Sequence, residues 1–207
     1  MRVLRQVALL VALGAALAGC SREDQVEGSA SARPAGCPAA LKPEWQRLAN
    51  RVRVPVYCPK WMPSPLDADI GGQWNSGGPV VGRDRHYLVG FLWHEAGSGD
   101  VHVNFRGYPG RTAVPRCRDV QPTGGKTRRR WVPCFSDPQG TRQIDDKKVT
   151  VYTVSRDADQ WHVTYLWRRN GTLYTVSEHV APPLTYRKVV ANLDRLVGGL
   201  ELIEPTV

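Results

Sequence analysis

The chain has 207 residues, of which 42% are hydrophobic, and it carries 28 lysines and arginines against 19 aspartates and glutamates. The formal net charge of +9 favours association with anionic phospholipid headgroups, phosphorylated wall polymers or acidic proteins. Charge governs solubility and association rather than fold, so it excludes no architecture. The length is that of one globular domain with a short leader.

The first 19 residues have the three parts of a secretory signal. Arg2 and Arg5 precede an uncharged apolar run at residues 7–17, and two small residues follow that run. This run of 11 residues is too short for a helix that crosses a bilayer, which needs about 20. We therefore predict a signal peptide over residues 1–19 rather than an uncleaved anchor.

The segment Leu17-Ala18-Gly19-Cys20 resembles the lipobox of bacterial lipoproteins and matches that motif at every position. The resemblance implies that a diacylglyceryl group is transferred to Cys20 and that a peptidase cleaves before it. Two or three acyl chains hold a protein stably at a membrane, whereas one chain does so only marginally. The expected location is extracytoplasmic, on either the cell membrane or the outer membrane, and Ser21 after the cysteine favours the outer membrane in proteobacterial lipoproteins.

The mature chain divides into a tether and a globular part. Residues 20–36 are predicted to be a lipidated flexible tether, because their small, polar and charged side chains cannot support a core. Residues 37–207 are expected to form a single extracytoplasmic domain. Nucleic acid is not an expected partner in that compartment.

The first predicted element of this domain is an amphipathic helix over residues 41–52, with Pro43 and Glu44 in its first turn. Residues 54–59 contain two prolines and are expected to form an extended edge segment rather than a central strand. Two Gly-Gly pairs then bracket Trp74 in a loop over residues 71–78, which would suit the rim of a groove.

Seven strands are predicted after this loop, at residues 86–94, 101–106, 112–120, 128–135, 148–155, 160–167 and 172–179. Short connections such as Asn170-Gly171 predict hairpins and therefore antiparallel pairing. A helix over residues 185–197, ended by Gly198-Gly199, would cover one face of the sheet. The predicted fold class is α+β, with an antiparallel sheet of about seven strands, a short N-terminal helix and a C-terminal helix packed on the sheet.

A second resemblance concerns the domain itself. Residues 149–202 look like the tail of bacterial extracytoplasmic domains of unknown function, and residues 56–59 and 61–63 are similar to the opening of those domains. Such domains occur on membrane-anchored and anti-sigma-associated proteins. The resemblance implies a non-enzymatic module built from a sheet and a helix.

Apart from Cys20, the cysteines are even in number, and in an exported chain they are expected to form disulfides. They are Cys37, Cys58, Cys117 and Cys134. Three pairings are possible, and we favour Cys37 with Cys58 and Cys117 with Cys134, because each pair brackets a compact segment. A metal or redox site is the alternative, but the chain has no Cys-x-x-Cys motif and no histidine close to these cysteines.

The densest positive charge lies around the second cysteine pair. Gly124-Gly125-Lys126-Thr127 is similar to the end of a phosphate-binding loop, but Val120 stands where that loop needs a glycine, so we predict a hairpin tip. The candidate anion-binding residues are Arg116, Arg118, Lys126, Arg128, Arg129 and Arg130. They could dock on anionic lipid or wall phosphate through Coulomb attraction and bidentate contacts. The alternative is a solvated loop in a basic protein.

No motif for catalysis or metal binding is complete. Pairing of His94 with His102 across a hairpin would supply half of a metal site, but no third ligand is indicated, so neither a metal nor a cofactor is predicted. Ser98 lacks the Gly-x-Ser-x-Gly frame of a nucleophile. The remaining histidines are His86, His162 and His179, each in or at the end of a predicted strand.

These observations favour a lipid-anchored, non-catalytic binding or accessory module of the cell envelope. One alternative is a hydrolase acting on wall or carbohydrate, with a groove built from His94, Glu95, Asp100 and His102. A second alternative is a carrier of an apolar ligand, held between a concave sheet and the last helix.

Overall fold

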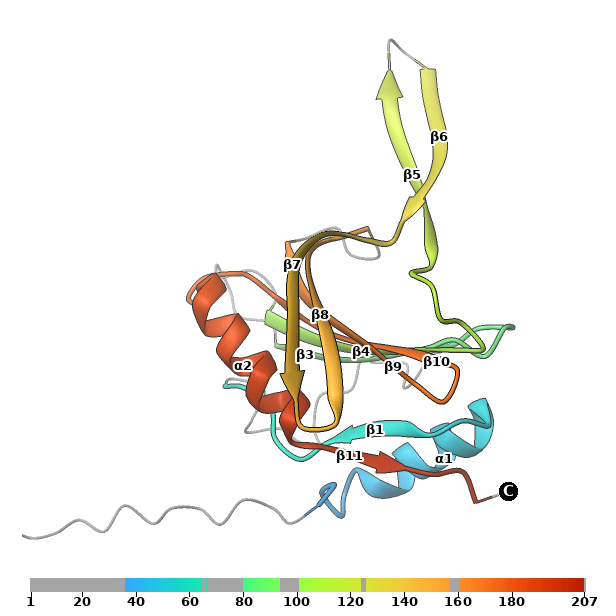
Figure 1. Ribbon diagram of the computed structural model, residues 1–207, viewed down its shortest axis with the longest axis vertical. Coiled ribbons are helices and arrows are strands. Elements are labelled where there is room, and N and C mark those ends of the chain that lie inside the picture. Colours follow the sequence, from blue (N-terminus) through green and yellow to red (C-terminus); the bar gives the residue numbers. More distant parts are fainter. Residues whose placement is uncertain are drawn as a thin grey trace, which may run out of the picture. The chain divides into compact units, whose positions relative to one another are not determined.

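The computed structural model describes residues 36–64, 66, 80–93, 101–123, 126–156 and 161–206 (Figure 1). The predicted signal peptide, Cys20, nearly all of the tether and the loop at 71–78 lie outside these residues. The fold is α+β, as predicted, with a seven-stranded antiparallel sheet and a C-terminal helix packed on it. None of the described helices has the length and apolar character needed to cross a membrane.

The large sheet has the strand order β2-β3-β4-β10-β9-β8-β7, and all neighbours are antiparallel. In that order the strands are β2 (Val80–Val81), β3 (Tyr87–Trp93), β4 (Val101–Pro109), β10 (Thr172–His179), β9 (His162–Arg169), β8 (Lys147–Ser155) and β7 (Phe135–Ile144). Asn170 and Gly171 both have positive φ angles, of 47° and 71°, which is the geometry of a two-residue type I′ turn. The predicted Asn-Gly hairpin between β9 and β10 is therefore confirmed.

Two helices share the apolar core with one face of this sheet. Helix α1 (Lys42–Val52) buries Trp45, whose ring meets Phe105 of β4 edge to face at a centroid distance of 5.8 Å. Helix α2 (Tyr186–Gly198) is capped by Thr185, whose side chain accepts a hydrogen bond from the amide of Lys188. Full burial of each large apolar side chain contributes about 1.5–3 kcal/mol, so this interface supplies much of the stability.

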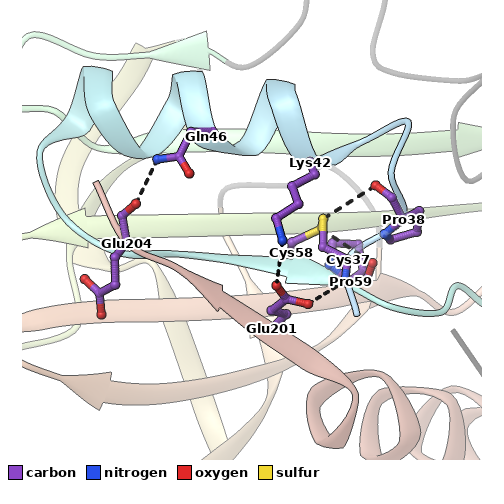
Figure 2. A network of polar contacts seen from close by, with 8 residues as sticks. All are labelled: Cys37, Pro38, Lys42, Gln46, Cys58, Pro59, Glu201 and Glu204. Atoms are coloured by element: carbon purple, nitrogen blue, oxygen red, sulfur yellow. Dashed lines mark hydrogen bonds and ion pairs between the residues drawn. A yellow bond between two sulfur atoms is a disulfide. The ribbon is translucent and has the colours of Figure 1, made fainter. Parts of the chain in front are cut away.

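A second, two-stranded sheet holds the N-terminal part of the domain to its C-terminal end. Strand β1 (Val56–Pro59), which was predicted only as an extended segment, pairs with the unpredicted strand β11 (Leu200–Ile203). Figure 2 shows that the amide of Cys37 donates a hydrogen bond to Glu201, which also forms an ion pair with Lys42 at 3.6 Å. Gln46 of α1 donates to the carbonyl of Glu204 at 2.8 Å.

The strand predictions need one correction. Strands β5 (Arg116–Thr123) and β6 (Lys126–Pro133) were expected in the large sheet, but they pair with each other in a separate two-stranded ribbon (Figure 1). The edges of the large sheet are instead β2 and β7, and β7 contains Pro138 and Gly140 and shifts register between Pro138 and Thr141. Proline and a bulge are both typical of edge strands, and they interrupt the pattern that would reveal β7 in the sequence.

The cysteines pair as the favoured prediction has them. Cys37 bonds to Cys58 with a Cα–Cα distance of 5.7 Å, and Cys117 bonds to Cys134 with one of 4.9 Å. The first bond joins the segment before α1 to β1, and the second closes the base of the β5–β6 hairpin. Two disulfides are typical of a protein that works in an oxidising compartment outside the cytoplasm.

Candidate functional site

The face of the large sheet that points away from the main apolar core carries polar side chains beside a smaller apolar cluster that includes Tyr108, Leu166 and Leu173. Side chains alternate between the two faces along a strand. In β4, Val103 and Phe105 belong to the core, so His102 and Arg106 lie on the opposite face. This surface, which we call the polar face, consists of His102, Asn104, Arg106, His162, Thr164, Thr175, Ser177 and His179. Most of these side chains are buried, and His102 and Asn104 are half-buried.

Arg106 is the only buried arginine among the described residues, with 7% of its surface exposed. Its Nη1 donates a hydrogen bond to Oγ of Ser177 at 3.3 Å. No carboxylate in the described part of the chain forms an ion pair with it. Buried charges are ordinarily paired, because removal of a charge from water is costly. The guanidinium of Arg106 is therefore a buried cation without a counter-charge among the described residues.

Hydroxyl groups beside Arg106 are also unsatisfied. Thr175 lies directly opposite Arg106 in the register of β10 with β4, and Thr164 lies opposite Ser177 in that of β9 with β10. Both threonine hydroxyls are buried and have no hydrogen-bond partner in the part of the chain that the structure describes. Unpaired buried hydroxyls are uncommon in folded proteins, so the polar face has an unused capacity for hydrogen bonding.

A pocket of about 380 Å³ opens beside Arg106, between β3, β4 and the base of the hairpin. Its charged lining consists of Asp84, Arg106, Arg111 and Arg116, and His86 also borders it. Asp84 accepts hydrogen bonds from His86 and from Arg111, the latter at 3.1 Å. The hydrogen bond from His86, assisted by Arg111, lowers the pKa of Asp84 to about 2. Asp84 is therefore ionised at neutral pH, and it orients Arg111 at the mouth of the pocket.

The five predicted anion-binding residues whose side chains are described lie on both sides of the hairpin rather than in one cluster. Arg116 lines the pocket, whereas Arg118, Arg128, Arg129 and Arg130 are exposed along the hairpin. Arg130 is paired with Asp119, at 2.9 Å between Nε and Oδ2. The side chain of Lys126 lies outside the described part.

One side of the hairpin combines positive charge with exposed apolar groups. In the register of β5 with β6, Arg118 is opposite Trp131 and Val120 is opposite Arg129, so these four side chains share a face. We call it the amphipathic face. Trp131 is 58% exposed and Val120 is 52% exposed. The guanidinium of Arg118 lies 5.7 Å from the centre of the Trp131 ring, within the range of a cation–π interaction.

Three histidines meet on the polar face, and sequence reasoning missed this cluster. The Nε2 atoms of His102 and His162 are 2.6 Å apart, so one ring donates a hydrogen bond to the other. The ring of His179 stacks on both, with centroid distances of 5.0 and 5.2 Å. His94, the predicted partner of His102, lies outside the described residues. The two-residue turn at Asn170-Gly171 already places His162 opposite His179, so extending the hairpin register would have paired them.

Nothing in these clusters is arranged as a metal centre. Within the described residues, no group of three histidine, cysteine, aspartate or glutamate side chains could hold a metal ion. Of the residues named for the hydrolase alternative, only His102 lies in the described part. Searches against protein-family models, curated proteins and solved structures found no match. The function has to be inferred from the geometry of the hairpin and the polar face.

Proposed function

We propose that this protein is a non-catalytic binding module of the bacterial cell envelope, anchored through lipid on Cys20, whose β5–β6 hairpin binds the surface of an anionic phospholipid membrane. The observation that carries the proposal is the amphipathic face, where Arg118 and Arg129 flank the exposed side chains of Trp131 and Val120. An anionic bilayer offers both parts of the complementary surface, namely negative headgroups and an apolar interior.

The charges of the amphipathic face suit such a surface. Each arginine or lysine near an anionic leaflet contributes about 1 kcal/mol of attraction. Arg118 and Arg129 have no ion-pair partner among the described residues, whereas Arg130 on the other side is neutralised by Asp119. The other side keeps one arginine without an ion pair among the described residues, Arg128, so the side with the tryptophan carries the larger share of the attraction.

The apolar groups favour lipid over a phosphorylated wall polymer. Tryptophan is enriched where membranes meet water, because its ring takes part in both environments. A wall polymer would engage the arginines equally well but would leave Trp131 and Val120 in water. Stable attachment to a membrane generally needs two signals, and a lipid chain with a basic patch is one such combination.

The polar face weakens the case for a carrier of apolar ligands. A carrier needs an apolar concave surface, but the two faces of the large sheet are otherwise occupied. One packs against both helices, and the other presents Arg106, the three histidines and the hydroxyl groups. The apolar side chains on that second face, Tyr108, Leu166 and Leu173, are already buried against Phe135.

The proposal is tested by sedimentation with vesicles. The exported full chain carrying Cys20→Ser, which has no acyl chain, is mixed with vesicles of phosphatidylcholine alone or of phosphatidylcholine with phosphatidylglycerol. We expect binding only to the anionic vesicles. The double variant Arg118→Gln/Arg129→Gln should weaken it by about 30-fold, since each arginine contributes about 1 kcal/mol.

The matched control is Arg51→Gln/Arg187→Gln, which removes two exposed arginines from the helices and so changes the net charge equally. Affinity should change little in this control and should fall in Trp131→Ser. Equal losses in the two double variants would mean that net charge alone drives binding. Binding to a soluble poly(glycerol phosphate) with none to vesicles would contradict the membrane proposal and favour a wall polymer.

A further inference from the structure

We propose that the pocket at the base of the hairpin is a binding site for a small phosphate dianion, either inorganic phosphate or a phosphate monoester, with Arg106 as its main recognition residue. This site is separate from the amphipathic face, and its occupancy does not depend on membrane binding.

The first argument is the missing counter-charge of Arg106. Its side chain is more than nine-tenths buried, borders the pocket and makes one hydrogen bond, to Ser177. A guanidinium has five N–H donors in a planar fork that matches two oxygens of a phosphate. An anion in the pocket would supply both the negative charge and the hydrogen-bond acceptors that the described residues do not provide.

The second argument is the charge balance of the pocket wall. Three arginines, Arg106, Arg111 and Arg116, face one carboxylate, Asp84, so two positive charges are in excess even when His86 is neutral. A phosphate monoester carries a charge of about −1.5 to −2 at pH 7. A monocarboxylate or a phosphodiester carries one negative charge. It would neutralise only one of the two excess positive charges of the pocket wall.

The third argument is the size and lining of the cavity. A volume of about 380 Å³ lies in the range of pockets that bind small molecules, which extends from about 300 to 1,000 Å³. Tyr87 and Leu88 supply apolar wall beside the charged groups, and the rings of His86 and Tyr108 are stacked at a centroid distance of 6.4 Å. The pocket can therefore hold a phosphate together with a small organic group.

The Cys117–Cys134 bond also borders this pocket. Arg116 immediately precedes Cys117, and Pro115 accepts a hydrogen bond from the amide of Cys134 at 2.8 Å. The covalent closure of the hairpin base therefore holds Arg116 beside Arg111. Such preorganisation reduces the ordering cost of binding an anion.

Isothermal titration of the oxidised full chain carrying Cys20→Ser tests the proposal with three probes. These are inorganic phosphate, glycerol 3-phosphate and glycerophosphoglycerol, the last being the headgroup diester of phosphatidylglycerol. We expect the two dianions to bind and the diester to bind at least about tenfold more weakly, because one negative charge is lost. Diester binding as tight as that of the dianions would overturn the dianion assignment and point to a lipid headgroup.

Variants locate the site. Arg106→Lys keeps the buried positive charge but removes the planar pair of N–H donors that matches two phosphate oxygens. It should weaken phosphate binding by about tenfold or more. Arg111→Gln tests the same pocket at an exposed position, so it remains informative if the buried variant fails to fold. Arg187→Gln on α2 and the hairpin variant Arg118→Gln/Arg129→Gln should bind phosphate as the parent chain does. No phosphate binding by the parent chain, or unchanged affinity in Arg111→Gln, would overturn the proposal.

Discussion

Asn192 of α2 donates a hydrogen bond to Glu178 of β10, with 2.8 Å between Nδ2 and Oε1. Both side chains are buried at the interface between helix and sheet, on the face opposite to the polar face. Burial raises the pKa of Glu178 to about 8, and the hydrogen bond from Asn192 lowers it only in part. The carboxyl group is therefore mostly protonated at neutral pH.

This protonation predicts a pH-dependent stability. The folded chain keeps a proton on Glu178 that the unfolded chain releases above its ordinary pKa of 4.5. The free energy of unfolding should therefore fall as the pH rises from about 4.5 to about 8, by up to about 1.4 kcal/mol per pH unit from this group. Urea unfolding at about pH 5.5 and about pH 7.5 measures the effect. Glu178→Gln is the control, and an identical pH dependence in this variant would rule out Glu178 as the cause.

A second prediction concerns the contact between β7, β9 and α2. The hydroxyl of Tyr165 donates to Oδ1 of Asp194 at 2.8 Å, and Nη1 of Arg142 donates to Oδ2 at 2.7 Å. We expect Asp194→Ala to lower the free energy of unfolding by about 1–3 kcal/mol, because a hydrogen bond to a charged group is lost. In a double-mutant cycle with Tyr165→Phe, the coupling energy should be about 1 kcal/mol. A coupling energy of zero would contradict the contact.

A third prediction concerns Gly107 of β4, which lies opposite Tyr87 of β3. A Cβ atom at position 107 would come within 2.2 Å of the Tyr87 ring, and that ring is buried. Gly107→Ala should therefore destabilise the fold by about 1–3 kcal/mol through overpacking, as measured by chemical unfolding. Adding Tyr87→Leu removes the obstructing ring, so the double variant should lose less than the sum of the single losses. Strict additivity would show that the clash is not the cause.

A fourth prediction concerns the Cys117–Cys134 bond. The oxidised chain should have an intact mass lower by four hydrogens than the reduced chain, from its two disulfides.

The Cys117–Cys134 bond closes a loop with a sequence separation of 17 residues, and such a closure contributes about 3 kcal/mol in the chain-entropy model. Cys117→Ser/Cys134→Ser should therefore speed tryptic cleavage after Arg118 and the other hairpin arginines. The control Cys37→Ser/Cys58→Ser should leave cleavage in the hairpin unchanged, and equal acceleration in both would argue for global loosening.

Features that depend on near neighbours could be predicted from the sequence. The helical spacing of apolar residues located α1 and α2 within one residue at each end, and Asn170-Gly171 located the central hairpin. The pairing of strands could not be predicted in this way. Alternation of apolar and polar residues identifies a strand but does not indicate which other strand it pairs with. The hairpin strands β5 and β6 were therefore assigned to the wrong sheet. Strand β7 was not predicted, because Pro138 and Gly140 interrupt its alternating pattern.

The candidate site depended still more on long-range contacts. Alternation along β4 places Arg106 away from the core, but nothing local indicates that this face is buried or that Ser177 lies beside Arg106. The pocket joins Asp84, Arg106 and Arg116, which are separated in sequence and meet only through the pairing of β3 with β4 and the closure of the hairpin base. The sequence located the basic hairpin, whereas the pocket became apparent only in three dimensions.

The Cys37–Cys58 bond also determines how the domain would bear a mechanical load. If the protein is tethered to a membrane through Cys20, tension in the tether enters the domain at Cys37. The disulfide passes that tension directly to β1, which is paired along its whole length with β11. Helix α1 lies within the loop that this bond closes, so the tension would bypass the helix. A pull on the anchor would therefore reach the paired strands without first unwinding α1.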